Sequence, residues 1–185
     1  MTSDGRSVTG KRRRKSRLIL VLGGAASGKS QVALDLAGQV GPRAFVATGQ
    51  ALDLEMKARI ERHQATRSPD WETAEVPADL AEWFSINNKN FQTIVLDCLT
   101  LWLSNLWGRR LRDVAVSEAT DDLLQTIRAT KARVVIVSNE LGLGLVPATK
   151  AVRAFRDLAG RVNQQVAAEA DEVYLTISGL PLRLK

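Results

Sequence analysis

Short apolar runs alternate along this chain with longer amphipathic segments. A continuous apolar run of about four to eight residues is typical of a strand covered on both faces, and a longer amphipathic segment is typical of a helix. The predicted strands are Leu18–Leu22, Ala44–Ala47, Thr93–Leu96, Arg133–Ser138 and Glu172–Ser178. The predicted helices are Lys29–Gly38, Leu54–Thr66, Leu99–Arg110, Glu118–Thr130 and Thr149–Ala168. This alternation predicts an α/β fold with a mainly parallel sheet flanked by helices.

Two regions depart from the alternation. The segment Leu182–Lys185 follows a Ser-Gly-Leu-Pro turn closely enough to return as a hairpin, so we expect an antiparallel C-terminal edge strand. Residues 69–92 contain Pro69, Pro77 and the polar run Asn87–Asn90, and we predict loops there.

Length and composition indicate one domain without a membrane segment. The chain has 185 residues, and no apolar run approaches the roughly 20 residues that span a bilayer. Cys98 is the single cysteine, which excludes an internal disulfide and fits a reducing compartment. We therefore expect a cytoplasmic protein.

The net charge of +6 is concentrated at the N-terminus. Seven of the 26 basic residues and one of the 20 acidic residues lie in positions 1–17, which leaves 19 of each in the rest of the chain. We predict a basic, disordered tail over 1–17 and a single neutral domain over 18–185. A neutral domain disfavours a nucleic-acid partner, because such a groove needs basic residues on the folded part.

The segment from Gly23 to Ser30 matches G-x-x-x-x-G-K-[ST], the phosphate-binding P-loop. It follows a predicted strand and begins a predicted helix, so backbone amides and the helix N-terminus would converge on phosphate oxygens. We expect Lys29 to act in catalysis on the β- and γ-phosphates and the Ser30 hydroxyl to bind Mg²⁺. The expected nucleotide-binding residues here are Gly23, Gly24, Ala25, Ala26, Ser27, Gly28, Lys29 and Ser30.

A second metal ligand is expected at the end of the strand Thr93–Leu96. Asp97 follows this apolar run directly, which is the Walker B arrangement, and its carboxylate would hold Mg²⁺ directly or through water. Taken alone, an aspartate after a strand is usually a turn residue. Beside a P-loop the metal-binding role is favoured.

His63 is the single histidine of the chain. Glu55, Arg59 and His63 follow one another at intervals of four and share one face of a predicted helix. Spacing alone favours a solvated surface histidine, and the alternative is a nucleophile that attacks a nucleotide phosphate. The spacing does not decide between the two.

Three further blocks of residues accompany the P-loop in a fixed order. The first is Ala47-Thr48 with Asp53-x-Glu55-Met56-x-x-Arg59-Ile60-x-x-His63-x-x-x-Arg67 and Trp71-x-Thr73-x-Glu75-x-Pro77; the second is Asp97-Cys98-Leu99-Thr100; the third is Ser138-Asn139-Glu140-x-Gly142-x-Gly144-x-Val146-Pro147 with Phe155-Arg156-Asp157-x-Ala159-Gly160-x-Val162-Asn163-Gln164. Together with the P-loop, these blocks resemble the bifunctional adenosylcobinamide kinase / adenosylcobinamide-phosphate guanylyltransferase family. The resemblance covers residues 18–185.

The resemblance implies a RecA-like sheet, a homotrimer and two linked reactions. The enzyme would phosphorylate adenosylcobinamide with ATP or GTP, and would then transfer GMP from GTP to adenosylcobinamide phosphate through a GMP-histidine intermediate on His63. An imidazole attacks only when unprotonated, so adduct formation should weaken below about pH 6.5, the ordinary histidine pKa. The nucleotide contacts implied outside the P-loop are Ala47, Thr48, Gly49, Gln64, Ala65, Thr66, Arg67, Glu75 and Asp97.

Glu140 lies shortly after the predicted strand Arg133–Ser138, and the sequence favours two roles for it equally. It could orient or deprotonate the cobinamide hydroxyl in the kinase reaction, or it could cap the following loop. Two alternative functions also remain open at this point. One is a small-molecule kinase without nucleotidyl transfer, and the other is a RecA-like nucleic-acid-dependent ATPase.

Overall fold

The computed structural model describes residues 17–65, 67–109 and 113–185, apart from the side chains of Arg59, His63 and Ala65. The predicted site residue Thr66 lies outside the described residues. The strands are β1 (Arg17–Gly23), β2 (Arg43–Ala47), β3 (Trp71–Glu75), β4 (Thr93–Asp97), β5 (Arg133–Asn139), β6 (Glu172–Ile177) and β7 (Leu180–Arg183). The helices are α1 (Lys29–Ala37), α2 (Leu54–Ala65), α3 (Leu80–Asn87), α4 (Leu99–Gly108), α5 (Asp113–Ala129) and α6 (Lys150–Glu169).

These strands form one seven-stranded sheet in the order β3-β2-β4-β5-β1-β6-β7. Every neighbouring pair is parallel except β6 and β7, which pair antiparallel at the edge. The expected α/β class, the mainly parallel sheet and the antiparallel C-terminal edge strand are therefore confirmed. The edge strand occupies Leu180–Arg183, two residues earlier than expected.

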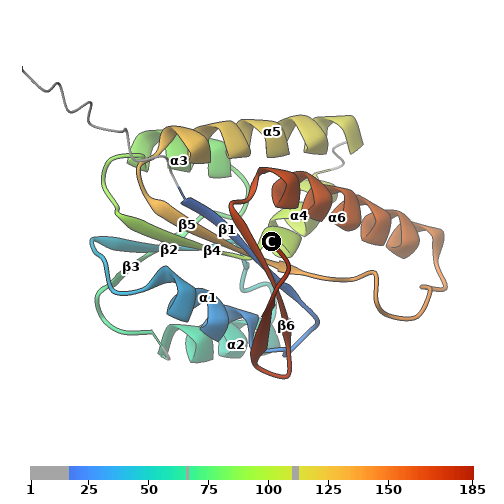
Figure 1. The fold of residues 1–185 in the computed structure, drawn as a ribbon. Helices are drawn as coiled ribbons and strands as arrows, with labels where there is room; N and C mark the ends of the chain where they lie inside the picture. Colours follow the sequence, from blue (N-terminus) through green and yellow to red (C-terminus); the bar gives the residue numbers. More distant parts are fainter. Residues whose placement is uncertain (1–16, 66, 110–112) are drawn as a thin grey trace, which may run out of the picture.

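Helices cover both faces of the sheet, with α1 and α2 on one side and α3, α4, α5 and α6 on the other (Figure 1). Successive side chains of a strand point to opposite faces. In β1, Leu18 and Leu20 accordingly join the core on the α3–α6 side, while Ile19 and Val21 pack with α1. Burial on both faces explains why the central strands read as continuous apolar runs.

Residues 69–92, predicted as loops, contain the strand β3 and the helix α3, so that prediction was wrong. As an edge strand, β3 pairs only with β2 and needs no apolar run. Trp71 holds it in place by packing edge-on against Phe45, with ring centroids 6.4 Å apart, and beneath the Arg43 guanidinium. The helix α3 is held by its buried Phe84, although its C-terminal end is polar in sequence and suggested a loop.

The helix boundaries also differ in places from the expected ones. α5 begins at Asp113, five residues before the predicted start at Glu118, and includes the buried Val116. β1 begins at Arg17, the last residue of the predicted tail, whose position pairs in register with Arg133. The tail 1–16 lies outside the described residues.

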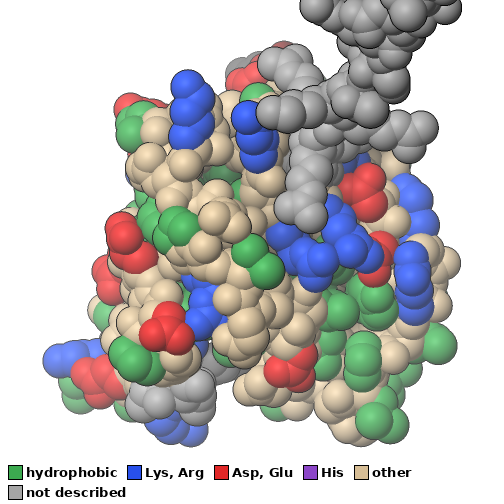
Figure 2. All heavy atoms as spheres, turned by 60° about the vertical axis from the view of Figure 1, so that its left-hand side comes forward, with side chains coloured by type: hydrophobic (Ala, Val, Ile, Leu, Met, Phe, Trp, Pro, Cys, Tyr) green, Lys and Arg blue, Asp and Glu red, His purple; other side chains and the backbone are tan. Residues whose placement is uncertain are grey.

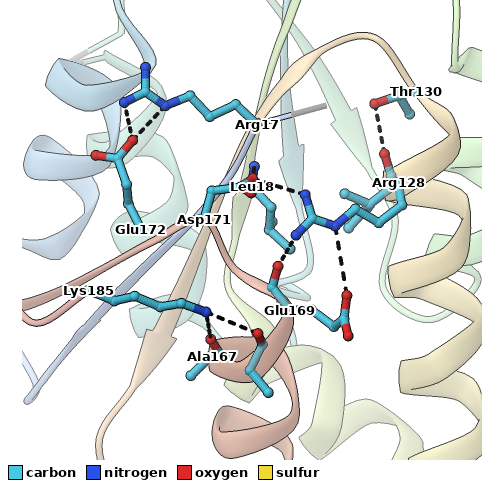
Figure 3. A network of polar contacts seen from close by, with 11 residues as sticks. Arg17, Leu18, Arg128, Thr130, Ala167, Glu169, Asp171, Glu172 and Lys185 are labelled. Atoms are coloured by element: carbon cyan, nitrogen blue, oxygen red, sulfur yellow. Dashed lines mark hydrogen bonds and ion pairs between the residues drawn. The ribbon is translucent and has the colours of Figure 1, made fainter. Parts of the chain in front are cut away.

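A network of polar contacts joins the amino ends of β1 and β6 to the ends of α5 and α6 (Figure 3). The Asp171 carboxylate accepts hydrogen bonds from the backbone amide of Leu18 and from Arg128, at 2.7 and 2.9 Å. Beside it, the Arg17 guanidinium pairs with the buried carboxylate of Glu172. This network lies at the edge of the sheet opposite to the carboxyl ends of the parallel strands, so it stabilises the fold away from the candidate site.

Candidate active site

The parallel register brings the carboxyl ends of the strands together at one edge of the sheet. Ala47 is in register with both Glu75 and Asp97, and Gly23 is in register with Asn139 and Thr176. Residues that are far apart in the sequence therefore meet at this edge, where ligands bind in open α/β sheets.

The P-loop takes the tight course that its glycines predict. Ala26 and Gly28 both have positive φ values, 52° and 93°. A Cβ at Gly28 would also approach the Cα of Gly179 to 3.0 Å, so both the conformation and the space require glycine. Gly179 lies in the turn between β6 and β7, and its amide donates a hydrogen bond to the Ser27 carbonyl at 2.8 Å. The C-terminal hairpin thus supports the P-loop from behind.

The two expected metal ligands lie together. The Ser30 hydroxyl donates a hydrogen bond to the Asp97 carboxylate, with 2.6 Å between Oγ and Oδ2. Lys29 is buried at the start of α1, and its ammonium group donates to the Gly24 carbonyl. A hydroxyl and a carboxylate beside a phosphate loop are the oxygen ligands that Mg²⁺ uses, usually completed by substrate phosphates and water. Among the described residues no group of three or more His, Cys, Asp or Glu side chains is placed to hold a metal ion.

Two cavities adjoin the P-loop on the α1–α2 side of the sheet. The first has a volume of about 590 Å³ and is lined by Ala26, Ser27, Gly28, Lys29, Ser30, Gln31, Leu34, Phe45, Glu55, Arg62 and Arg67. The second has a volume of about 260 Å³ and is lined by Ala25, Lys29, Ser30, Phe45, Ala47, Gly49, Met56, Ile60, Gln64, Arg67, Asp97, Cys98, Leu101 and Asn139. They share a wall at Lys29, Ser30, Phe45 and Arg67. Phe45 was not among the predicted site residues, whereas Asn139 was expected at the end of a strand and lines the second cavity.

Arg67 forms part of both cavities and lies over the Phe45 ring, with its guanidinium carbon 3.8 Å from the ring centroid. Its Nη1 is buried and has no hydrogen-bond partner among the described residues. Burial lowers the pKa of the guanidinium, while the charge of Asp97 acts in the opposite direction. A desolvated cation beside Lys29 is well suited to bind phosphate oxygens.

Thr48, predicted to contact the nucleotide, is fully buried, and its hydroxyl is hydrogen-bonded to backbone groups. Its hydroxyl donates to the Cys98 carbonyl at 2.7 Å and accepts from the Cys98 amide at 2.9 Å. The Asn105 side chain in turn donates to the Thr48 carbonyl at 2.9 Å. These bonds hold the segments after β2 and β4 together, beside Asp97, and the hydroxyl lines neither P-loop cavity.

Glu140 lies directly after β5, and its backbone amide donates to the Gly23 carbonyl at 3.0 Å. Its carboxylate accepts a hydrogen bond from the Gly142 amide at 2.7 Å, as the loop-capping interpretation expects. The same carboxylate lines a third cavity, away from the α2 side of the P-loop. Asn139, the preceding residue, lines the cavity that contains Lys29 and Asp97.

A buried hydrogen-bond network holds the end of β5 in place. Ser138 Oγ donates to Asn163 Oδ1 at 2.7 Å and lies 3.2 Å from Thr100 Oγ1. The Asn139 amide donates to Thr100 Oγ1 at 2.8 Å, and its carbonyl accepts from Asn163 Nδ2 at 3.1 Å. Two helices, α4 and α6, therefore set the position of the Asn139–Glu140 segment.

The remaining predicted residues lie at the rim. Glu75 is exposed at the end of β3, in register with Ala47, and lines neither P-loop cavity. His63 lies in α2 between Arg62, which lines the first cavity, and Gln64, which lines the second. The side chains of His63 and Ala65 are outside the description.

Charged side chains of both signs lie on the described surface. On the face drawn in Figure 2, basic and acidic side chains are interspersed, and the largest basic group has acidic side chains beside it. Within 17–65, 67–109 and 113–185, no helix combines the length and the apolar character needed to cross a bilayer.

Comparison with known proteins identifies close relatives. A family model described as "Cobinamide kinase / cobinamide phosphate guanyltransferase" matches residues 19–184. The chain is 38% identical over 180 residues to the bifunctional adenosylcobalamin biosynthesis protein CobU of Escherichia coli, and equally to that of Salmonella typhimurium, covering 91% of this chain and 99% of each relative. It is 40% identical over 171 residues to the bifunctional adenosylcobalamin biosynthesis protein CobP of Pseudomonas aeruginosa, covering 90% of this chain and 96% of that protein.

Proposed function

Because the chain belongs to the cobinamide kinase / cobinamide phosphate guanyltransferase family and is a bifunctional enzyme of adenosylcobalamin biosynthesis, we propose that its P-loop cavities bind the nucleotide for both reactions. We propose further that His63 carries GMP between the nucleotide and the corrinoid phosphate. The observation that carries this proposal is the position of α2, which contributes Arg62 to one cavity and Gln64 to the other, on either side of His63.

In the kinase reaction, the hydroxyl of adenosylcobinamide attacks the terminal phosphorus of ATP or GTP. The new O–P bond forms as the bond to the nucleoside diphosphate breaks, and the hydroxyl proton leaves to a base. Glu140 is the candidate for this base, because it follows β5 and is hydrogen-bonded to the P-loop through its own backbone. Lys29 and Arg67 offset the charge that develops on the phosphate oxygens.

In the guanylyl transfer, an unprotonated imidazole nitrogen of His63 attacks the α-phosphorus of GTP, and pyrophosphate leaves. A phosphate oxygen of adenosylcobinamide phosphate then attacks the same phosphorus and breaks the N–P bond. The products are adenosylcobinamide-GDP and free His63. Two displacements replace one difficult transfer between two anions, which is the advantage of a covalent intermediate.

Ser30 and Asp97 would hold Mg²⁺, since their side-chain oxygens lie together beside the phosphate loop. When bound there, the ion neutralises phosphate charge and orients the nucleotide for in-line attack. The remaining expectations are a homotrimer, supported by the family resemblance, and a cytoplasmic location, supported by the single cysteine.

The direct test is the intact mass of the protein after incubation with Mg²⁺ and GTP. The expected result is a gain of one GMP unit in the parent and in Lys57→Ala, a matched change at an exposed position of α2. The gain should be absent from His63→Ala, with GTP binding retained. A GMP adduct that persists in His63→Ala would exclude this residue as the carrier.

The matched family carries both activities, so the alternative of a kinase without nucleotidyl transfer is not supported.

A further inference from the structure

The third cavity lies between the end of β5 and the helix α6, beside the P-loop. It has a volume of about 470 Å³ and is lined by Leu22, Glu140, Gly142, Arg156, Asp157, Gly160, Asn163, Gln164 and Ala167. Leu22 precedes the P-loop directly, and the Glu140 amide is hydrogen-bonded to Gly23. A molecule in this cavity would therefore lie next to the phosphate loop, on the side away from α2.

Gly160 is the unusual residue of this cavity. It lies in the interior of the 20-residue helix α6, where glycine destabilises a helix relative to alanine. A Cβ at this position would meet no atom within 4 Å among the described residues. The fold around it thus gives no packing reason for glycine, whereas the absent side chain leaves the helix backbone bare for a close-lying ligand.

The polar groups around Gly160 are of mixed type. Glu140 and Asp157 supply carboxylates, Arg156 a guanidinium and Gln164 a carboxamide. Asn163 fixes this wall, because both ends of its amide are engaged with the end of β5. Donors and acceptors side by side around this cavity suit a ligand with many amide groups better than a phosphate.

We propose that this third cavity binds the corrinoid, with the edge of the macrocycle against the bare helix at Gly160. The carboxamide arms of the ring would pair with Asp157 and Gln164, and the hydroxyl to be phosphorylated would reach past Glu140 toward the P-loop. This assignment rests on the proposed function, which requires a corrinoid beside the nucleotide. The third cavity is the surface that would bind the corrinoid.

The experiment measures adenosylcobinamide binding by equilibrium dialysis, using the visible absorbance of the corrin ring. Gly160→Leu fills the space over the helix with a good helix-forming residue. Gly160→Ala measures the effect of helix propensity with the smallest possible side chain. Ala154→Leu, at an exposed position of the same helix outside the cavity, is the matched control. Each variant is also tested for the GMP adduct, for its melting temperature and for its mass in solution.

The expected result is at least a tenfold weaker binding of adenosylcobinamide to Gly160→Leu, with no change in Ala154→Leu. Gly160→Ala should melt about 2–4 °C higher than the parent, as expected for relief of a helix glycine. Adduct formation from GTP should stay within twofold in Gly160→Leu, because no corrinoid takes part in it.

Three results would overturn the proposal: unchanged corrinoid binding in Gly160→Leu, an equal loss of the GMP adduct, or a changed oligomeric mass, which would mean that the cavity receives a second copy of the chain. Failure of the His63 assignment gives a different pattern. In that case the GMP adduct either persists in His63→Ala or does not form on the parent protein, while the effect of Gly160→Leu on dialysis remains.

Discussion

The Ser30 hydroxyl donates a hydrogen bond to the Asp97 carboxylate across 67 positions of the chain, with 2.6 Å between the two oxygens. Ser30 is the second residue of α1, and Asp97 ends β4, two strands away from β1 in the sheet. The P-loop motif and the Walker B aspartate were predicted from separate local patterns, so their contact is an independent structural result. It brings the two proposed Mg²⁺ ligands together beside Lys29.

Replacing Asp97 by asparagine should raise the Mg²⁺ concentration that both reactions require. Loss of one anionic oxygen is expected to lower metal affinity by about 10- to 100-fold, and Ser30→Ala should have a smaller effect in the same direction. The measurement is the Mg²⁺ concentration for half-maximal kinase rate. Asp35→Asn, an exposed carboxylate on α1 that pairs with Gln31, is the control and should match the parent. If Asp97→Asn needs the same Mg²⁺ concentration as the parent for half-maximal rate, Asp97 is not a metal ligand.

Gly23→Ala should destabilise the protein even without nucleotide. A Cβ at Gly23 would lie 2.6 Å from both the Ser27 hydroxyl and the Thr176 carbonyl, and the second of these is backbone. Overpacking of this kind costs about 1–3 kcal/mol in the free energy of unfolding. The neighbouring Gly24→Ala is the control, since its Cβ would meet no described atom within 4 Å and should change stability by less than about 0.5 kcal/mol. Urea denaturation compares the two, and equal costs would contradict the packing argument.

The sequence predicted best what is encoded locally. The P-loop from Gly23 to Ser30 and the apolar run before Asp97 each contain their own strand, turn or helix signal within a few residues. The central strands were equally clear because burial on both faces demands continuous apolar runs.

The missed features depend on contacts between distant segments. The strand β3 is held by Trp71 against Phe45 and Arg43, which a weak local pattern cannot reveal. Similarly, which cavity Asn139 lines depends on the position of β5 between β1 and β4 in the sheet. The hydroxyl of Thr48, a residue predicted to contact the nucleotide, bonds to Cys98 50 positions away, and no local pattern predicts that bond.

Cys98 should be inert toward thiol reagents in the folded protein. Burial, with a further contribution from the charge of Asp97, raises the pKa of the thiol to about 12. Only the thiolate is nucleophilic, so at pH 8 the native protein should react with Ellman's reagent at least about 100-fold more slowly than the denatured protein. The measurement is absorbance with and without guanidinium chloride. Rapid reaction of the native protein would mean that the thiol is accessible and ionised.

Glu172 should make stability depend on pH under acidic conditions. Burial alone would raise its pKa, but hydrogen bonds from Tyr174 and Arg17 and the charges of Arg17 and Arg183 lower it below the usual value. A carboxylate with a lowered folded-state pKa stabilises the protein above its unfolded pKa, about 4.3, and this contribution is lost as the pH falls through the folded value. Parent stability should therefore fall more steeply than that of Glu172→Gln between about pH 5 and pH 3.

Urea denaturation at a series of pH values checks this. Glu82→Gln changes an exposed carboxylate on α3, and its free energy of unfolding should vary with pH as steeply as that of the parent. If the free energy of unfolding of Glu172→Gln varies with pH as steeply as that of the parent, the ion pair with Arg17 makes no pH-dependent contribution to stability.

The Ser138–Asn163 pair should couple stability to the kinase reaction. Each side chain is buried, and the hydrogen bond between them holds the end of β5 against α6. Ser138→Ala and Asn163→Ala should each cost about 1–3 kcal/mol, because a buried partner is left unsatisfied. The double variant should cost less than the sum, by about 0.5–3 kcal/mol, since both changes remove the same bond.

The functional effect follows from what this bond positions. Asn163 also donates to the Asn139 carbonyl, so its loss should displace Glu140 and lower the kinase kcat more than the rate of GMP-adduct formation. Gln165→Ala removes a half-buried amide on the same helix that bonds to Ser117 and Asp121 of α5, and it should cost about 0.5–1.5 kcal/mol while leaving both rates unchanged. A merely structural role for Asn163 predicts that both rates fall together with stability. Additive costs in the double variant would likewise show that Ser138 and Asn163 act separately, and the position of Glu140 would then depend on Thr100 and Gly23 alone.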